Sequence, residues 1–205
     1  MNKIAIFGGG AVLLAAVGVG AWMAFPRDSA DRFAGCSETN AMSASIGGPF
    51  TLVDETGRTV TDQDVFTEPS VIYFGYTFCP DVCPLDNWRN AEAATLLEGE
   101  GVSMQPVFIS VDPQRDTPEV VADFTDVFHP RMLGLTGSPE QVDAASKAYR
   151  TYYRAHDAEE DEFYLVDHST YSYLVLPEYG FVEFFRRDVS AEEMAERVAC
   201  FVEQA

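Results

Sequence analysis

The segment that decides the fold is VIYFGYTFCPDVCP, residues 71–84. It opens with four apolar residues, Val71–Phe74, which is typical of a short strand buried on both faces. Pro84 suits the first turn of a helix, where proline has no hydrogen bond to lose, and we expect that helix to reach about Gly99. A second apolar run, Pro106–Val111, follows. The segment therefore predicts a β-α-β unit with two cysteines between its first strand and its helix.

Signals for further elements flank this unit on both sides. Two β-hairpins are expected, at residues 50–60 and 171–185, with a short strand at Leu133–Thr136. Three more helices have start signals: at Thr117, at Ser138 with a capping box, and at Ser190. Strands that alternate with helices and end in a hairpin and a helix predict an α/β thioredoxin-like domain. Its central sheet would be flanked by helices and extended by an amino-terminal hairpin.

Composition limits the classes of function. The chain has 205 residues, with 13 Lys and Arg against 33 Asp and Glu, and a formal net charge of −20. Binding to a phosphate backbone requires clustered basic side chains, so nucleic acid is excluded as a partner. The length fits one compact domain with an appendage. No apolar stripe remains beyond what a core needs, and we therefore expect a monomer.

The appendage lies at the amino terminus. Ile4–Phe25 is an uncharged run of 22 residues, and a helix of that length spans about 33 Å, enough for the core of a bilayer. Lys3 precedes it, so the positive-inside rule sends the following residues out of the cytoplasm. A cleavable signal peptide is the alternative, but its apolar region is usually only about 7–15 residues long. We expect a transmembrane anchor at 1–25, a flexible tether at 26–48 and the folded domain at 49–205.

The compartment follows from this anchor. The chain has no Arg- and Ser-rich amphipathic leader of the kind that directs import into organelles. The simplest location is a bacterial inner membrane, with the folded domain in the periplasm. Disulfides are permitted there.

The two cysteines of the central segment are candidate metal ligands. Cys79 and Cys83 each precede a proline, which disfavours helical backbone, so we expect a stiff extended loop. Cys83 would lie at a helix amino terminus, where the helix dipole favours thiolate. His168, just before a predicted central strand, is the expected third donor. Two sulfurs and one imidazole satisfy trigonal Cu(I), whereas structural zinc normally needs a fourth ligand, so copper is preferred.

Four other polar residues are weighed against these three. Asp81 and Asp167 lie beside the candidate ligands in sequence. Each is either a hydrogen-bond partner, an oxygen donor to an oxidised metal, a solvated carboxylate or a helix cap, and we place neither among the ligands. His129 and His156 have no cysteine neighbour; we expect the first in a loop or helix end and the second in solvent. The turn Asp112–Thr117 is interpreted as structural.

The remaining cysteines, Cys36 and Cys200, bracket the folded domain. In an oxidising compartment they would pair, and closing so long a loop would contribute up to about 4–5 kcal/mol in the chain-entropy model. The alternative is two unpaired thiols.

Four segments together resemble the Sco/SenC family of membrane-tethered copper proteins, which help assemble the binuclear copper centre of cytochrome c oxidase. They are Gly48–Leu52, Tyr73–Pro84, Ser110–Pro118 and Val166–Ser169. The resemblance covers roughly residues 45–204 and implies that Cys79, Cys83 and His168 hold the copper. The acidic run 157–162 has no counterpart in the motif and is interpreted as a solvated loop, with partner docking as the alternative.

The resemblance implies a metallochaperone and not an enzyme. Copper, as Cu(I) with Cu(II) as a second form, would pass to the copper-centre subunit of the oxidase. The upstream partner would be a copper donor or a thiol reductant. The alternative is a thiol–disulfide oxidoreductase in which Cys79 and Cys83 reduce the cysteines of that centre. Against it, the spacing is C-x-x-x-C, and a redox pair gives His168 no obligatory part. A peroxidase has no separate supporting feature, and a purely structural disulfide also leaves His168 unexplained.

Overall fold

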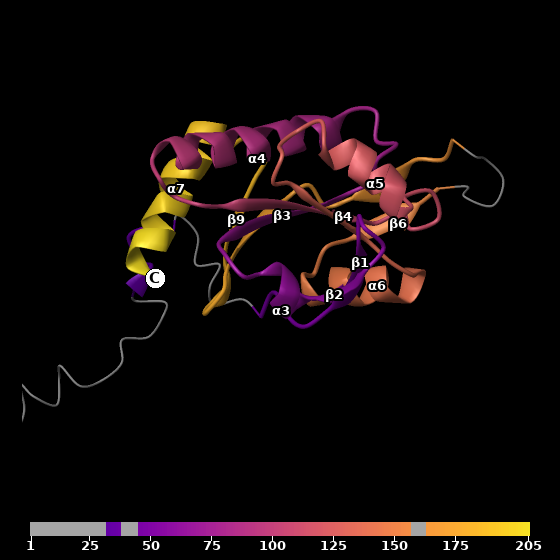
Figure 1. The fold of residues 1–205 in the computed structure, drawn as a ribbon, viewed down its shortest axis with the longest axis horizontal. Helices are drawn as coiled ribbons and strands as arrows, with labels where there is room; N and C mark the ends of the chain where they lie inside the picture. Colours follow the sequence, from indigo (N-terminus) through magenta and orange to yellow (C-terminus); the bar gives the residue numbers. More distant parts are fainter. Residues whose placement is uncertain (1–31, 38–44, 157–162) are drawn as a thin grey trace, which may run out of the picture.

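The computed structural model describes residues 32–37, 45–156 and 163–205. The described chain forms a thioredoxin-like α/β fold around a seven-stranded mixed sheet with the order β2-β1-β5-β4-β3-β8-β9 (Figure 1). The strands of this sheet are β1 (Thr51–Asp54), β2 (Thr59–Thr61), β3 (Ser70–Gly75), β4 (Gln105–Ser110), β5 (Leu133–Thr136), β8 (Ser172–Leu176) and β9 (Gly180–Phe185). A separate two-stranded sheet pairs β6 (Tyr153–Ala155) with β7 (Val166–His168).

The centre of the sheet is parallel and its edges are antiparallel. β3 runs parallel to β4, and β4 runs parallel to β5, while β8 joins β3 in the antiparallel sense. All six residues of β3 are buried, as expected for a strand covered on both faces. The β1–β2 and β8–β9 pairs confirm the two predicted hairpins. Because β3 and β4 are parallel, their carboxyl ends meet at one edge of the sheet, where open α/β sheets place their sites.

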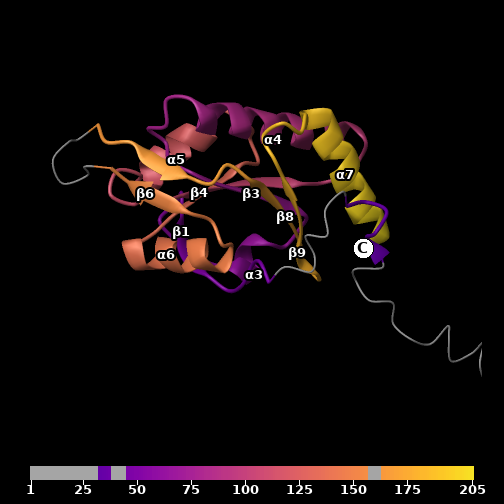
Figure 2. The same ribbon diagram turned by 180° about the vertical axis from the view of Figure 1, so that it is seen from behind.

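Helices cover both faces of this sheet (Figures 1 and 2). The helices are α3 (Asp62–Val65), α4 (Val82–Gly99), α5 (Pro118–Thr125), α6 (Pro139–Ala148) and α7 (Ala191–Gln204). α4, α5 and α7 lie on one side, and α3 and α6 lie on the other (Figure 2). The predicted caps are present, because Thr117, Ser138 and Ser190 each accept a hydrogen bond from the first turn of their helix. Ser138 also completes the predicted capping box with Gln141.

One local expectation is wrong. Cys83 does not lie in an extended loop but is the second residue of α4, and Cys79 lies in the turn before the helix. Proline disfavours helical backbone at the residue before it, but Pro84 is only the third residue of α4. The first N–H groups of a helix have no helical carbonyl to bond, so the helix loses no hydrogen bond by having a proline at this position. The N–H of Cys83 is directed to the Cys79 sulfur at 3.4 Å instead.

The first described residues are held against the last helix. Phe33 is fully buried, and its ring centroid lies 5.2 Å from that of Phe201 on α7. Cys36 forms a disulfide with Cys200, with the two Cα atoms 5.6 Å apart. The predicted pairing is therefore present, and it fixes a point that the sequence places in the tether.

The predicted anchor at residues 1–25 and the acidic run at 157–162 lie outside the described residues. In the ranges that the structure does describe, no helix is long and apolar enough to cross a membrane. The boundaries of anchor, tether and domain stay predictions.

Candidate metal centre

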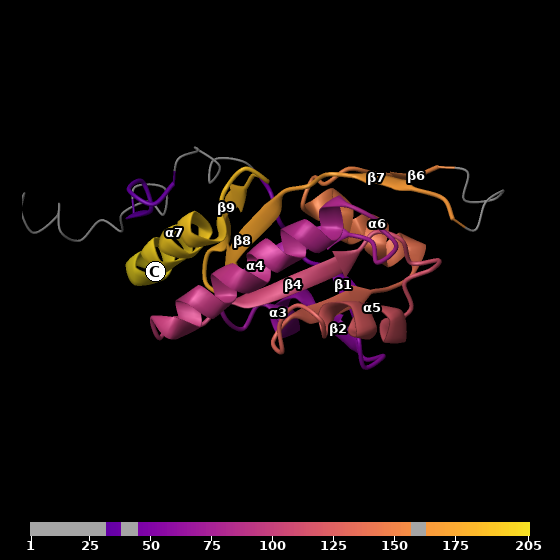
Figure 3. The ribbon, with the colours of Figure 1, turned by 90° about the horizontal axis from the view of Figure 1, so that it is seen from above.

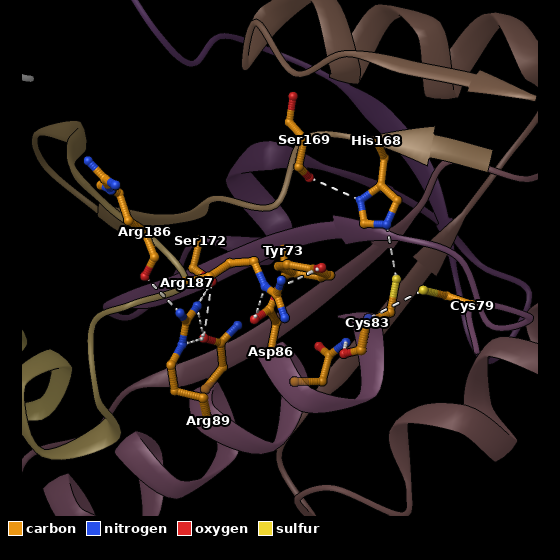
Figure 4. Close-up of polar contacts among 12 residues, drawn as sticks. Tyr73, Cys79, Cys83, Asp86, Arg89, His168, Ser169, Ser172, Arg186 and Arg187 are labelled. Atoms are coloured by element: carbon orange, nitrogen blue, oxygen red, sulfur yellow. Dashed lines mark hydrogen bonds and ion pairs between the residues drawn. The ribbon is translucent and has the colours of Figure 1, made fainter. Parts of the chain in front are cut away.

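The three predicted ligands come together in the structure. Cys79 follows β3, Cys83 lies in the first turn of α4, and His168 is the last residue of β7. Their sulfur and nitrogen atoms all lie within 4.8 Å of one another, and Cys83 Sγ is 3.2 Å from His168 Nε2 (Figure 4). Figure 3 shows β7 beside the amino-terminal end of α4. Among the described residues, no other three His, Cys, Asp or Glu side chains form such a group.

A glycine makes room for the Cys83 sulfur. A Cβ atom on Gly75, the last residue of β3, would lie 2.8 Å from Cys83 Sγ, 2.9 Å from Tyr73 Cε1 and 3.1 Å from Phe108 Cε2. Ordinary contacts begin at 3.4 Å, so no side chain fits there. Sequence reasoning missed this role, although a lone glycine that ends an apolar strand signals a close approach of another group.

The two thiols have opposite electrostatic environments. A hydrogen bond from the Cys83 thiol lowers the pKa of Cys79 well below its ordinary value, outweighing the effect of burial, and the N–H groups of Asp81 and Cys83 add to this. Burial raises the pKa of Cys83 far above its ordinary value. The favoured thiolate is therefore Cys79 and not the expected Cys83. The reason is position: Cys79 accepts a hydrogen bond from the Cys83 thiol and lies before the helix, where it also receives N–H groups, whereas Cys83 is completely buried.

His168 is oriented by its neighbours. Its Nδ1 lies 3.0 Å from the carbonyl oxygen of Ser169. A carbonyl can only accept, so Nδ1 carries the proton, and the lone pair of Nε2 faces Cys83. The rings of Tyr73 and Tyr76 meet the imidazole edge to face, with centroids 6.0 and 5.8 Å away. Such contacts fix the tautomer and ring plane of a histidine that binds metal.

The other predicted candidates lie outside the group of donor atoms. Asp81 occupies the cap position of α4, but its side chain makes no capping hydrogen bond. Asp167 is exposed and lies 2.7 Å from His156 Nε2, so that histidine has a carboxylate partner as well as solvent. His129 is buried, with its Nε2 3.7 Å from a carboxylate oxygen of Glu98.

The turn between β4 and α5 supports the loop that carries Cys79. The carboxylate of Asp116 is buried and accepts hydrogen bonds from the Thr77 N–H at 3.0 Å, the Thr77 hydroxyl at 2.6 Å and the Ser110 hydroxyl at 2.6 Å. Burial raises its pKa in spite of these bonds. The predicted structural role of this turn therefore has a specific form, because Asp116 ties residues 76–78 to the end of β4.

An arginine on the same turn links this loop to the approach to β7. The Arg115 Nε lies 2.6 Å from a carboxylate oxygen of Asp112. Its guanidinium lies over the ring of Tyr164 at 3.6 Å and that of Phe78 at 4.8 Å. Tyr164 also donates its hydroxyl proton to Asp112. Arg115 thus bridges the loop before Cys79 and the segment that leads into β7, the strand that ends in His168.

The donor set limits the chemistry. Two sulfurs and one imidazole nitrogen can hold a soft metal ion in three-fold coordination. Cys79 and Cys83 are both free thiols, so the pair could also cycle between dithiol and disulfide. His168 is partly exposed, which leaves the group of donors open to solvent on one side.

Comparisons with known proteins agree with this arrangement. The family model described as SCO1/SenC matches residues 38–203. The chain is 51% identical over 203 residues to Protein SenC of Rhodobacter capsulatus, covering 98% of this chain and 91% of that protein. It is 42% identical to the mitochondrial SCO2 homolog of Homo sapiens over 87% of this chain and 68% of that one.

Two solved structures described as copper-bound have the same fold. One is Arabidopsis thaliana ScoI with copper bound, at 42% identity and a TM-score of 0.74, covering 78% of this chain and 99% of that one. The other is yeast Sco1 with copper bound, at 38% identity and a TM-score of 0.72, covering 79% and 91%.

Proposed function

The chain belongs to the SCO1/SenC family, and from this premise we propose that it is a copper chaperone. Cys79, Cys83 and His168 bind Cu(I), with Cu(II) as a second form, and the metal then passes by ligand exchange to the binuclear copper centre of cytochrome c oxidase. The amino-terminal run Ile4–Phe25 anchors the chain in a bacterial inner membrane, with the folded domain in the periplasm.

The observation that carries the proposal is the group of three donor atoms. Two sulfurs and a lone-pair nitrogen lie within 4.8 Å of one another, and no fourth Cys, His, Asp or Glu of the described chain joins them. Three soft donors suit Cu(I), whereas structural zinc sites are usually four-coordinate. The position at the ends of β3 and β7, with His168 partly exposed, leaves the ion accessible to a ligand from an acceptor.

The test is a competition for Cu(I). The full chain, reduced and kept anaerobic in detergent, is titrated with Cu(I) against the chelator bicinchoninate. We expect one tightly bound copper, with Cys79→Ser, Cys83→Ser and His168→Ala each weakening binding at least ten-fold. His156→Ala is the matched control, because this histidine pairs with Asp167 outside the donor group, and it should bind as the native chain does. Binding that is indifferent to His168→Ala would contradict the proposal.

Delivery is tested separately from binding. The copper-loaded chain is mixed with the metal-free copper-centre domain of the oxidase, and the visible spectrum of the completed centre is followed. Transfer from the native chain, with none from the His168→Ala variant at equal total copper, is the expected result. A chain that binds copper tightly but never releases it to this domain would refute delivery while leaving binding intact.

A thiol–disulfide reductase is the second candidate, and the asymmetry of the two thiols favours it. The lowered pKa of Cys79 and the raised pKa of Cys83 resemble an attacking thiolate beside a resolving thiol. In that reaction, oxidation of the two thiols to a disulfide would supply two electrons and two protons to a disulfide of the acceptor. If the chain is a reductase, the His168→Ala variant should still reduce the acceptor disulfide in the absence of copper. If it is only a copper chaperone, no such reduction is required.

A further inference from the structure

Tyr73 lies beside two of the three candidate metal ligands, Cys83 and His168, and is not itself a metal ligand. It lies on β3 two residues before Gly75, and side chains alternate along a strand, so both face α4. Its ring packs edge to face on His168. Its Cε1 and the Cys83 sulfur lie 2.9 and 2.8 Å from the same point beside Gly75, so ring and sulfur are neighbours. Tyr73 is fully buried, so its hydroxyl is shielded from bulk water.

The hydroxyl of Tyr73 has a carboxylate acceptor. Its oxygen lies 2.9 Å from Asp86 Oδ2, and Asp86 Oδ1 lies 3.2 Å from the Nε of Arg187 (Figure 4). Asp86 is buried, whereas the side chain of Arg187 is 41% exposed. A chain of polar groups therefore leads from the Cys83 sulfur through Tyr73 and Asp86 to an arginine at the surface.

Resting on the proposed function, we propose that Tyr73 is a positioning residue whose hydroxyl changes hydrogen-bond acceptor when copper binds. In the metal-free chain it donates to Asp86, as the structure shows. When Cys83 binds copper it does so as a thiolate, which accepts hydrogen bonds strongly, and the hydroxyl then donates to that sulfur. The proton stays on the Tyr73 oxygen throughout, and only its acceptor changes.

Arg187 allows the change to occur at low cost. A buried carboxylate that loses its partner is destabilised, but Asp86 keeps its ion pair with Arg187 after Tyr73 turns away. Arg187 thus weakens the hold of Asp86 on the hydroxyl and favours the copper-bound arrangement. Neutralising Asp86 has the same effect, because an amide oxygen is a weaker acceptor than a carboxylate.

This arrangement predicts signs opposite to those of simple charge attraction. Removing the positive charge of Arg187 should strengthen the binding of a cation by Coulomb's law, but through Tyr73 it should weaken it. Removing the negative charge of Asp86 should weaken binding by Coulomb's law, but through Tyr73 it should strengthen it. Two neighbours supply matched controls: Arg186 pairs with Asp188, and Asp81 makes no capping bond.

The experiment measures Cu(I) affinity of the full chain in detergent by competition with bicinchoninate. Tyr73→Phe keeps the ring and should weaken binding about ten-fold, the lower end of the effect of removing a partner from a metal ligand. Tyr149→Phe, at a buried tyrosine packed on Phe74, should leave binding unchanged. Arg187→Gln should weaken binding about three-fold and Asp86→Asn should strengthen it about three-fold, by the net worth of one hydrogen bond.

Two further readouts separate this role from a general loss of structure. In the Tyr73→Phe background, Arg187→Gln should no longer weaken binding, because the hydroxyl through which it acts is gone, and only the slight Coulomb tightening seen for Arg186→Gln should remain. The sulfur-to-copper absorption band of the Cu(II) form should move to longer wavelength in Tyr73→Phe, since the sulfur loses a hydrogen bond. Arg186→Gln and Asp81→Asn should follow Coulomb's law, with slightly tighter and slightly weaker binding respectively.

Three results would overturn the inference. The first is a Tyr73→Phe chain that binds Cu(I) within two-fold of the native chain. The second is tighter binding by Arg187→Gln, as for Arg186→Gln, and the third is weaker binding by Asp86→Asn, as for Asp81→Asn. In each of those cases the native chain still binds copper, and the proposed function stands. If the native chain itself does not bind Cu(I), the proposed function fails and this inference fails with it.

Discussion

Replacing Gly75 with alanine should damage the metal centre more than the fold. The new Cβ would lie 2.8 Å from Cys83 Sγ, and ordinary contact begins at 3.4 Å, so the sulfur must retreat by about 0.6 Å (3.4 − 2.8) if nothing else moves. Sites that bind metal tolerate about 0.5 Å of displacement. Tyr73 and Phe108 crowd the same point and are both fully buried, so neither can swing away. Overpacking of this kind costs about 1–3 kcal/mol of stability.

The assay combines urea unfolding with Cu(I) competition on the full chain. Gly75→Ala should lower the free energy of unfolding by about 1–3 kcal/mol, with a lower urea midpoint. It should also bind Cu(I) at least ten-fold more weakly. Gly99→Ala is the matched control. Gly99 is the last residue of α4, at the opposite end of that helix from Cys83, and nothing lies within 4 Å of its added Cβ. Alanine is the better helix former by up to about 1 kcal/mol, so this variant should not lose stability. A Gly75→Ala chain with native stability and native affinity would refute the packing argument.

Two further predictions concern stability. The Cys36→Ser/Cys200→Ser double variant opens a loop of sequence separation 164, which the chain-entropy model values at about 5 kcal/mol; urea unfolding should show a loss of a few kcal/mol with Cu(I) affinity unchanged, and an unaltered unfolding midpoint would contradict this. Burial raises the pKa of Asp54, but hydrogen bonds from Thr56 and Arg58 outweigh it and hold that pKa below its ordinary value of 3.8. Its contribution to stability is therefore present above about pH 4 and lost as pH falls through the lowered pKa. Asp54→Asn should lower stability at neutral pH and flatten its fall in acid, and an unchanged acid slope measured by urea unfolding at several pH values would refute this.

Local signals in the sequence predicted most of the fold. Apolar runs located β3, β4 and β5, and the cap residues Thr117, Ser138 and Ser190 located three helix starts. These features succeed because each depends on neighbours within a few residues. The four-residue helix α3 and the short pair β6–β7 were missed, since neither is long enough to show a period.

The three donors could be chosen from the sequence, but their surroundings could not. The C-x-x-x-C spacing and the soft ligand types pointed to Cys79, Cys83 and His168, and the family resemblance implied the same set. The reversal of the two thiols depends on the hydrogen bond from the Cys83 thiol to Cys79 and on the burial of Cys83, both of which need the folded chain. The contact of Asp86 with Tyr73 joins α4 to β3 across the protein interior, and no local pattern encodes it.

The three metal ligands are held by two different sheets, and this decides which substitutions are informative. Cys79 and Cys83 follow β3 in the seven-stranded sheet, whereas His168 comes from β7, which pairs with β6 in a separate sheet. The two sulfurs therefore keep their mutual geometry through the main sheet. His168 keeps its place through the rings of Tyr73 and Tyr76 and through the Ser169 carbonyl. Tyr73 on β3 and Tyr76 in the loop that follows β3 both pack on the imidazole, so these two rings connect the main sheet with the strand that carries His168.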